Sequence, residues 1–273
     1  MGALSARGVA RIMSGFDYIP SPGDGAAWVT GASAGIGRAV ALKMAAEGWT
    51  VYATARSAEA LAAMAAEQPN IRPAPGDVTD IAAMRAIVDR IAQDGPLALA
   101  VLNAGVYQPM RAQEFSAEEA RKTFDVNLTG VANGVDPVLK LLFKQGKGCL
   151  ALTASVAGYR GLPRAAAYSA TKAGLIAMAE ALAFDMAPRG LRISVINPGF
   201  VETEATSVND FKMPFLMTTD QAATRIVEGL KKPGFEIAFP TRFVMILKAL
   251  GFLRPRSYFW LVRKGIGWDK VDQ

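Results

Sequence analysis

Short apolar segments that alternate with amphipathic segments constrain the fold of this chain more than any other feature. The apolar segments occupy residues 26–30, 50–54, 70–74, 98–102, 149–153, 192–197 and 236–239. The helical patterns occupy residues 37–47, 57–67, 80–93, 117–143, 167–187 and 219–231. Strand–helix alternation of this kind implies βαβ units and a parallel sheet that is covered by helices on both faces. We therefore expect a single α/β domain.

The chain divides into three parts by composition. Residues 1–24 show no sustained period and end in a cluster of Pro, Gly, Ser and Asp, so they are interpreted as an N-terminal extension. Residues 25–240 carry the strand–helix alternation and form the expected domain. Residues 241–273 mix apolar and basic side chains and are interpreted as a C-terminal helical extension. The length of 273 residues is sufficient for one large domain with a substantial core.

The residue types that are missing exclude several classes of chemistry. The sequence contains no histidine, which excludes Ser-His-Asp and Cys-His nucleophiles and metal sites that need imidazole. We expect no bound metal. The one cysteine, Cys149, stands in an apolar run and has no partner for an intrachain disulfide, so it is expected to be a core residue. A reducing, cytoplasmic compartment fits this cysteine usage.

The net charge of +6 is concentrated near the C-terminus. Seven basic residues between positions 241 and 273 stand against Asp269 and Asp272, a net charge of +5, so the first 240 residues carry only the remaining +1. A nucleic-acid-binding fold usually spreads its basic residues over one face. This distribution therefore argues against nucleic acid as a partner.

A glycine-rich segment, TGASAGIG at residues 30–37, joins the first expected strand to the first expected helix. Glycines let the backbone turn tightly and approach a pyrophosphate, and a helix N-terminus supplies N–H groups and the positive end of a dipole. The spacing departs from G-x-G-x-x-G because Val40 stands at the last glycine position. Its setting between strand and helix favours a dinucleotide-binding turn over a merely structural one.

The end of the second expected strand has no carboxylate. A site for NAD usually places Asp or Glu there, whereas a 2′-phosphate requires a guanidinium and a hydroxyl. Arg56 and Ser57 supply these groups, and Arg38 adds a second cation. The cofactor is therefore predicted to be NADP(H). The alternative is that Arg56 is a solvated surface residue.

Tyr168 and Lys172 stand four residues apart in an expected helix, so their side chains share one face. An ammonium beside a phenol stabilises the phenolate and lowers its pKa. Such a phenol can exchange a proton with an alcohol or a carbonyl near neutral pH. Because this spacing also occurs by chance, its meaning depends on the surrounding motifs.

These features together resemble the short-chain dehydrogenase/reductase family over residues 26–240. The motifs that carry the resemblance are Thr30-Gly31-xxx-Gly35-x-Gly37, Asp77-Val78, Asn103-Ala104-Gly105, Asn127, Ser155, Tyr168, Lys172, Pro198-Gly199, Val201 and Thr203. Leu102 departs from the family because many members have Asn at this position. The resemblance implies one doubly wound Rossmann domain with a seven-stranded, mainly parallel sheet in the order 3-2-1-4-5-6-7.

The resemblance also implies the roles of individual residues. Tyr168 would be the acid or base, Lys172 would lower its pKa and bind the nicotinamide ribose, and Ser155 would bind the substrate oxygen. Asn127 would hold a water that connects Lys172 to solvent. The predicted cofactor-binding residues are Gly31, Ser33, Gly35, Ile36, Gly37, Arg38, Arg56, Ser57, Asp77, Val78, Asn103, Ala104, Gly105, Tyr168, Lys172, Pro198, Gly199, Val201 and Thr203. A homodimer or homotetramer through the helices at 117–143 and 167–187 is a further implication.

The substrate site is predicted from residues beside these motifs. Tyr107 and Tyr159 follow the Asn-Ala-Gly motif and Ser155, and Phe211 and Phe215 lie in a segment that would form a mobile lid. The apolar residues of this segment indicate a hydrophobic alcohol or ketone as substrate. Simple packing of the lid onto the domain explains them equally well.

Residues 241–264 allow two interpretations. Lys248 and Pro255 interrupt the apolar run, which is too short to span a bilayer. Two short helices here would either pack on the domain or on a second subunit with their cations outward, or lie on an anionic membrane surface. Packing is favoured because apolar–basic helices are common at protein surfaces and interfaces.

The sequence as a whole predicts an NADP(H)-dependent oxidoreductase that interconverts a ketone or aldehyde and an alcohol, on a lipophilic substrate. A catalytically silent NADP(H)-sensing protein of the same fold is the alternative. The complete set of four expected catalytic residues argues against it, because a sensor needs no proton relay. A membrane-surface scaffold is a third possibility that depends on residues 241–264 alone.

Overall fold

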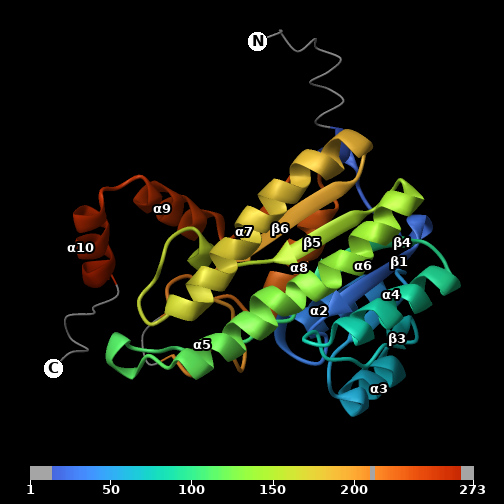
Figure 1. Ribbon diagram of the computed structural model, residues 1–273, viewed down its shortest axis with the longest axis horizontal. Helices are drawn as coiled ribbons and strands as arrows, with labels where there is room; N and C mark the ends of the chain where they lie inside the picture. Colours follow the sequence, from blue (N-terminus) through green and yellow to red (C-terminus); the bar gives the residue numbers. More distant parts are fainter. Residues whose placement is uncertain (1–13, 210–212, 266–273) are drawn as a thin grey trace, which may run out of the picture.

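The computed structural model describes residues 14–209 and 213–265 and is built around a seven-stranded sheet (Figure 1). The strands are β1 (Ala26–Thr30), β2 (Val51–Thr54), β3 (Ile71–Pro73), β4 (Leu97–Leu102), β5 (Cys149–Thr153), β6 (Arg192–Pro198) and β7 (Glu236–Phe239). Their order is β3-β2-β1-β4-β5-β6-β7, and every neighbouring pair is parallel. The predicted fold and strand order are confirmed.

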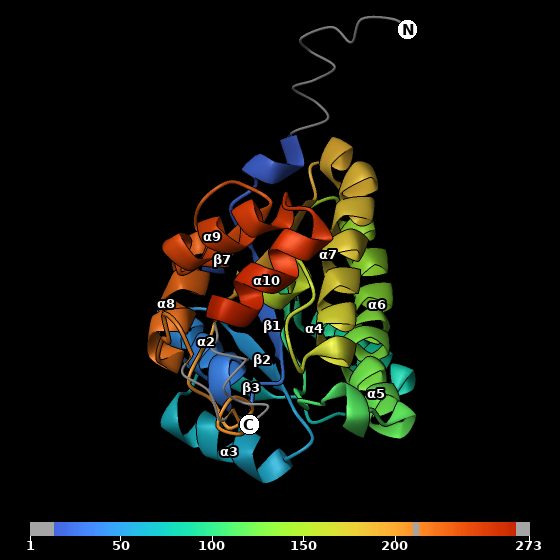
Figure 2. The same ribbon diagram turned by 90° about the vertical axis from the view of Figure 1, so that its left-hand side faces the viewer.

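Helices cover both faces of the sheet, as Figure 2 shows in a view along its plane. They are α2 (Gly35–Ala46), α3 (Ala58–Glu67), α4 (Ile81–Asp94), α5 (Ala117–Phe124), α6 (Gly130–Gln145), α7 (Ala166–Met186), α8 (Thr219–Leu230), α9 (Thr241–Gly251) and α10 (Pro255–Gly265). The core of one face includes residues of α2, α3 and α8, and the core of the other includes residues of α4, α6 and α7. Two covered faces explain why the strands are apolar along their whole length.

Neighbouring residues of the central strands supply the two cores alternately. Val29 and Ala151 belong to the core under α2 and α8, whereas Trp28 and Leu150 belong to the core under α6 and α7. Side chains of a strand alternate between its faces, so each strand contributes to both layers. Every residue of β4 and β5 is buried, and this places the sheet at the centre of the molecule.

The long helix expected at residues 117–143 is interrupted. A π-helical turn at Asp125–Thr129 separates α5 from α6. Asn127 lies within this turn and is fully buried. Its Oδ1 accepts from the Val106 N–H at 2.7 Å, and its Nδ2 donates to the Val106 carbonyl at 2.8 Å. The wider turn therefore coincides with a side chain that binds main chain of a different segment, which is typical of π turns at functional sites.

The segment before β1 packs on the domain. Phe16 contacts Phe235 edge to face at a centroid distance of 6.0 Å, and the Lys147 ammonium lies 2.5 Å from the Asp24 carboxylate. The buried guanidinium of Arg192 donates to the Tyr18 carbonyl at 3.2 Å. Residues 14–24 are thus attached to the domain near the starts of β5, β6 and β7. The division at residue 24 stays a prediction.

The chain after β7 forms two short helices at one end of the molecule (Figure 1). α9 buries Phe243, Val244 and Leu247 in a small cluster with Val156, which follows β5. Pro255 is the first residue of α10, a position where its missing N–H costs no helical hydrogen bond. Over the described part of the chain, no helix has both the length and the apolar character needed to cross a membrane.

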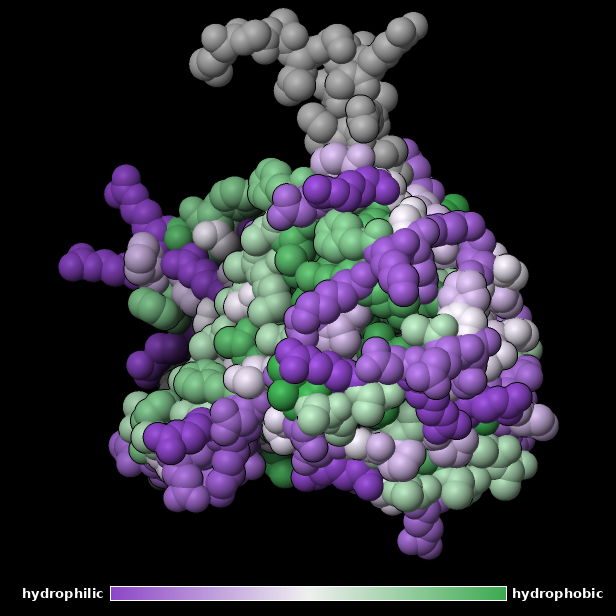
Figure 3. All heavy atoms as spheres, turned by 45° about the vertical axis from the view of Figure 1, so that its right-hand side comes forward, coloured by the Kyte–Doolittle hydropathy of each residue, from purple (hydrophilic) through white to green (hydrophobic). Residues whose placement is uncertain are grey.

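Figure 3 shows the side of the molecule that carries α4, α6 and α7, where hydrophobic side chains reach the surface between hydrophilic ones. The exposed apolar residues of these helices include Phe143 and Phe184, and Phe184 is 82% exposed. Exposed aromatic side chains are enriched at protein interfaces. The predicted oligomer contact through the helices at 117–143 and 167–187 stays a prediction.

We predict that Gly37→Ala destabilises the protein. A Cβ at this position would lie 2.2 Å from the Gly31 carbonyl oxygen and 2.5 Å from Asn103 Nδ2, so α2 would have to move away from β1. The expected loss in the free energy of unfolding is roughly 1–3 kcal/mol by urea denaturation. Gly251→Ala is the control, because its Cβ would meet no atom within 4 Å. An unchanged urea midpoint for Gly37→Ala would contradict this packing.

Candidate active site

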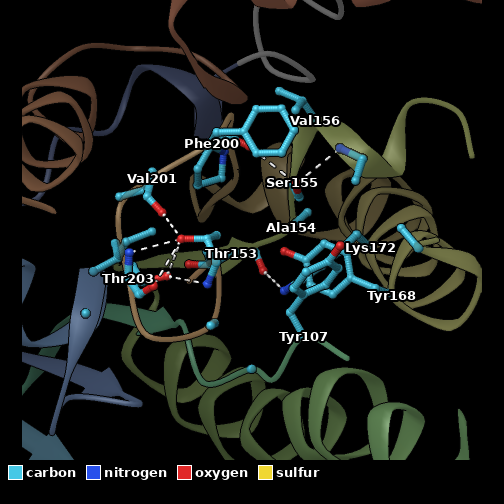
Figure 4. Close-up of a pocket in the computed structure, with 18 of the residues that line it drawn as sticks. Tyr107, Thr153, Ala154, Ser155, Val156, Tyr168, Lys172, Phe200, Val201 and Thr203 are labelled. Carbon is cyan, nitrogen blue, oxygen red and sulfur yellow. Dashed lines mark hydrogen bonds between the residues drawn. The ribbon is translucent and has the colours of Figure 1, made fainter. Parts of the chain in front are cut away.

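A cavity of about 750 Å³ lies at the carboxyl ends of six strands. The loops after β1, β2, β3, β4, β5 and β6 contribute to its walls, because parallel strands all end at the same edge of the sheet. In Figure 4, Val201 and Thr203 lie on one side of this cavity and Tyr168 and Lys172 on the other. Ser155 lies between them, above Thr153 at the end of β5.

The glycine turn forms one end of the cavity. Gly31 and Gly35 have φ angles of +67° and +55°, in the left-handed region that favours glycine. A Cβ on Gly31 would lie 2.7 Å from the Ala104 Cα, so a side chain there would fill the turn. Ala34, at the N-cap of α2, has no side chain that could accept the first helical N–H groups. This arrangement of small residues and helix N–H groups fits a dinucleotide pyrophosphate.

Other residues of the turn divide between the cavity and the core. Ser33 and Ile36 line the cavity with the glycines. Gly37 does not line it and instead lies under the turn, against Gly31 and Asn103. Gly37 was predicted to bind the cofactor, and in the structure it has a packing role under the turn.

Arg56 lies on the cavity wall at the end of β2 and is exposed. Asp77 and Val78 line the same region. The Thr79 backbone N–H holds the pKa of the Asp77 carboxyl below its usual value, and the positive charge of Arg56 acts in the same direction. A persistent carboxylate and a guanidinium thus lie at the adenosine end of the expected cofactor site.

The other two residues expected near the 2′-phosphate do not line the cavity. Ser57 is the N-cap of α3, and its Oγ accepts from the Ala60 N–H at 3.1 Å. Arg38 lies on α2 and forms an ion pair with Glu67 of α3 at 2.5 Å. The structure therefore brings only Arg56 of these three residues to the cavity.

The Asn-Ala-Gly segment after β4 joins the two central strands. The backbone N–H groups of Asn103 and Ala104 both donate to the Thr30 Oγ1, at 2.9 and 3.1 Å. A Cβ on Gly105 would lie 3.3 Å from Asn127 Oδ1 and 3.5 Å from Lys172 Nζ. All three residues line the cavity, and Gly105 leaves room for the side chains of Asn127 and Lys172.

Ser155, Tyr168 and Lys172 meet at the base of the cavity (Figure 4). Ser155 Oγ accepts from the Ala157 N–H at 3.1 Å and donates to the Pro198 carbonyl at 3.3 Å. Lys172 Nζ donates to the Thr153 carbonyl at 2.8 Å. Its ammonium lies 5.5 Å from the Tyr168 ring centroid, one turn away on α7. A phenol, a hydroxyl and an amine are therefore held together at one point of the cavity.

Burial shifts the pKa values of both groups on α7. It lowers the pKa of the Lys172 ammonium to about 8. It raises the pKa of the Tyr168 phenol to about 12, while the nearby Ser155 hydroxyl acts in the opposite direction. Removal of the phenol from water is the largest cause of this raised pKa. The expectation that Lys172 lowers the pKa of Tyr168 stays a prediction.

Part of the cavity wall is aromatic. Tyr107 contacts Tyr168 edge to face at 5.0 Å, and its hydroxyl donates to the Asn209 Oδ1 at 3.2 Å. Phe215 stacks on Phe243 of α9 with a centroid distance of 5.7 Å, and both rings line the cavity. The predicted cofactor-binding residues Pro198, Gly199, Val201 and Thr203 also line the cavity.

Two predicted substrate residues are not placed at the cavity. Tyr159 is absent from its wall because its side chain turns toward β7, where the hydroxyl donates to Glu236 Oε1 at 2.5 Å. The chain position of Tyr159 after Ser155 indicated proximity but not side-chain direction. Phe211 lies outside the described residues.

Sequence reasoning missed the contribution of the last two helices. The cavity residues that α9 and α10 supply are Phe243, Ile246, Leu247, Leu250, Leu261, Val262 and Gly265. The spacing of Phe243, Leu247 and Leu250 is that of one helix face, which predicts a buried stripe. It does not say which surface that stripe covers.

A protein-family model described as short chain dehydrogenase matches residues 25–212, more than half of the chain. The chain belongs to the short chain dehydrogenase family. The predicted family membership is confirmed.

Relatives and solved structures agree with this assignment. An uncharacterized oxidoreductase of Myxococcus xanthus is 39% identical over 219 residues, which cover 78% of this chain and 87% of the relative. The 3-oxoacyl-[acyl-carrier-protein] reductase FabG of Thermotoga maritima is 34% identical and covers 65% of this chain and 74% of its own. A short chain dehydrogenase of Burkholderia cenocepacia, solved in complex with NADP, has a TM-score of 0.76 and 26% identity. The match covers 87% of this chain and 98% of that one.

We predict that Lys172 makes the stability of this short chain dehydrogenase depend on pH. Between pH 8 and about 10.5 the unfolded chain keeps the Lys172 proton and the folded chain does not. The free energy of unfolding should therefore rise with pH, by about 1.4 kcal/mol per unit from this group. Lys172→Met should lack this rise in urea denaturation without cofactor.

The control is Lys144→Met, an exposed position that leaves Lys172 in place and should keep the wild-type pH dependence. If the free energy of unfolding changed with pH in the same way for the wild type and for Lys172→Met, burial would not lower the pKa of Lys172.

Proposed function

We propose that this protein interconverts a ketone or aldehyde and an alcohol with NADP(H) as the hydride carrier. One observation carries the proposal: Ser155, Tyr168 and Lys172 meet in a cavity that also reaches the glycine turn and Arg56. When bound, NADPH supplies the hydride for carbonyl reduction. The residues of the chain orient the carbonyl and provide the proton.

Tyr168 would donate the proton to the carbonyl oxygen. A phenol whose pKa is raised to about 12 is protonated at neutral pH and therefore carries the proton that reduction requires. Ser155 would hold the same oxygen by a hydrogen bond, because its hydroxyl is buried at the base of the cavity. In alcohol oxidation Tyr168 would act as the base, which requires its pKa to fall in the complex.

Lys172 and Asn127 would return the proton to Tyr168. An amine whose pKa is lowered to about 8 exchanges protons readily near neutral pH. Lys172 Nζ and Asn127 Oδ1 both lie against Gly105, which supports a water held between them. Lys172 would also bind the ribose hydroxyls of the cofactor.

Arg56 supports NADP(H) over NAD(H). It is exposed on the cavity wall at the end of β2, where no carboxylate follows the strand. The guanidinium suits a 2′-phosphate, and the turn at Gly31 and Gly35 suits the pyrophosphate. The Burkholderia cenocepacia structure in complex with NADP supports the same cofactor.

The substrate would be lipophilic. The rings of Phe200 and Phe215 each stack on the ring of Phe243 of α9, and all three residues line the cavity. Leu247 and Leu250 continue this apolar wall. The Thermotoga maritima relative, named as a 3-oxoacyl-[acyl-carrier-protein] reductase, supports a ketone on an acyl chain.

We predict that Tyr168→Phe lowers turnover by about 10²–10⁴-fold. The measurement is NADPH absorbance with a panel of ketones that emphasises long chains. NADPH binding should change little, because the ring remains and only the hydroxyl is lost. Tyr52→Phe, which removes a hydroxyl bonded to Asp94 outside the cavity, is the control and should keep its activity.

Turnover of Tyr168→Phe within a few-fold of the wild type would exclude this role for the phenol. A wild-type protein that binds NADPH and reduces no member of the panel would favour the NADP(H)-sensing alternative.

We predict that Arg56→Asp raises the KM for NADPH at least about tenfold and changes the KM for NADH much less, because a charge-assisted contact to the 2′-phosphate is lost. Steady-state kinetics with both cofactors is the measurement. Arg225→Asp makes the same charge change at an exposed position of α8 outside the cavity and serves as the control. Equal losses for both cofactors would show that Arg56 does not select the phosphate.

A further inference from the structure

The outer side of α9 and α10 exposes a group of large apolar side chains, which we call the α9–α10 patch. Its members and their exposed fractions are Met245 (65%), Ile246 (48%), Phe252 (91%), Phe259 (61%), Trp260 (60%) and Leu261 (37%). Scattered exposed apolar residues are ordinary, but a contiguous group on one pair of helices marks an interaction site. Packing on the domain therefore accounts for only one side of these helices.

The two helices that carry the patch are also basic. Residues 241–265 contain six basic residues and no Asp or Glu. These are Arg242, Lys248, Arg254, Arg256, Arg263 and Lys264. Lys248 forms an ion pair with Glu236 of β7, and the other five lie on exposed positions of the two helices and the turn between them. A partner of this surface must accept both aromatic side chains and cations.

Arg160 fixes the orientation of the two helices. Its Nη1 donates to the carbonyls of Leu250, Gly251 and Leu253 at 2.9–3.2 Å, and its guanidinium lies 3.9 Å from the Tyr258 ring centroid. The Tyr258 hydroxyl donates to the Gly161 carbonyl at 2.6 Å. The turn between α9 and α10 is thus attached to the loop that follows Ser155.

The patch shares residues with the wall of the active-site cavity. Ile246 and Leu261 are exposed and also line the cavity, so the two surfaces share an edge. Figure 2 looks onto this end of the molecule, where α10 crosses in front of the sheet. A surface that covers the patch would therefore lie beside the cavity.

We propose that the α9–α10 patch docks on an anionic lipid bilayer and that the cavity takes its lipophilic substrate from that bilayer. Apolar side chains such as Phe252 and Trp260 would enter the interface, and the cations would contact lipid phosphates. The docking stands on the surface alone, whereas the supply of substrate rests on the proposed function.

Charge argues against a second copy of this chain on the patch. A symmetric dimer places the same surface of each copy against the other, so the cations of two patches would meet. Like charges at an interface are unfavourable, and the segment offers no carboxylate to pair with them. An anionic bilayer removes this repulsion.

The test is co-sedimentation of the full chain with vesicles of phosphatidylcholine alone or mixed equally with phosphatidylglycerol. We expect binding to the anionic vesicles at low salt and weaker binding as salt increases. Phe252→Ser and Trp260→Ser should each weaken binding several-fold. Phe184→Ser removes an exposed aromatic ring from α7 and is the matched control, expected to bind as the wild type does.

Charge is tested by a second pair of variants. Arg254→Glu with Arg256→Glu should weaken binding at least about tenfold. Arg225→Glu with Lys232→Glu changes the net charge equally at exposed positions on and just after α8, and should have a smaller effect. Equal losses in the two double variants would show general attraction by net charge and overturn the proposal.

Three further outcomes are decisive. Absence of binding to anionic vesicles at low salt overturns the docking. A dimer that forms without lipid and dissociates in Phe252→Ser, seen by sedimentation velocity, assigns the patch to a second copy and also overturns it. Activity on a water-soluble ketone separates the two proposals. If the protein binds vesicles but reduces no ketone, only the proposed function is contradicted. If it reduces the ketone but does not bind vesicles, only the docking is contradicted.

Discussion

Parallel pairing of seven buried strands is the constraint on which the rest of this molecule depends. Since all strands run in one direction, the loops after β1, β2, β3, β4, β5 and β6 meet at one edge. The helices that connect the strands cover both faces, so this edge is where polar side chains can gather around a cavity. The backbone N–H groups of Asn103 and Ala104 both donate hydrogen bonds to Thr30 Oγ1. These two bonds hold the two central strands together at that edge.

Removal of ionisable groups from water determines the chemistry that the cavity can perform. Burial lowers the pKa of Lys172 and raises that of Tyr168, because removal from water disfavours the charged form of each group. At neutral pH the chain thus holds a protonated phenol beside an amine that is still mostly protonated but loses its proton more readily than an exposed lysine. Removing these two groups from water costs free energy, and the large apolar core formed by the surrounding sheet and helices offsets this cost.

Local spacing predicted the glycine turn and the shared helix face of Tyr168 and Lys172, whereas the strand order and the grouping of these two residues with Ser155 were implied by the family resemblance. Neither predicted that Arg38 pairs with Glu67, that Ser57 caps α3 or that Tyr159 turns toward Glu236. Each of these side chains binds a partner that lies close to it in the folded chain instead of lining the cavity. Which groups are close is decided by the three-dimensional structure. The π turn around Asn127 also depends on a distant partner, the Val106 backbone.

The sequence by itself determined that residues 26–240 form a parallel α/β domain with a dinucleotide turn, because hydrophobic period and glycine placement specify these elements locally. It also determined that residues 241–264 are apolar and basic. Only the tertiary structure decided that α9 and α10 form a wall of the active-site cavity and expose a second apolar face beside it. The physical reason is that helical period specifies which side chains share a face, whereas the surface against which that face packs is set by the whole fold.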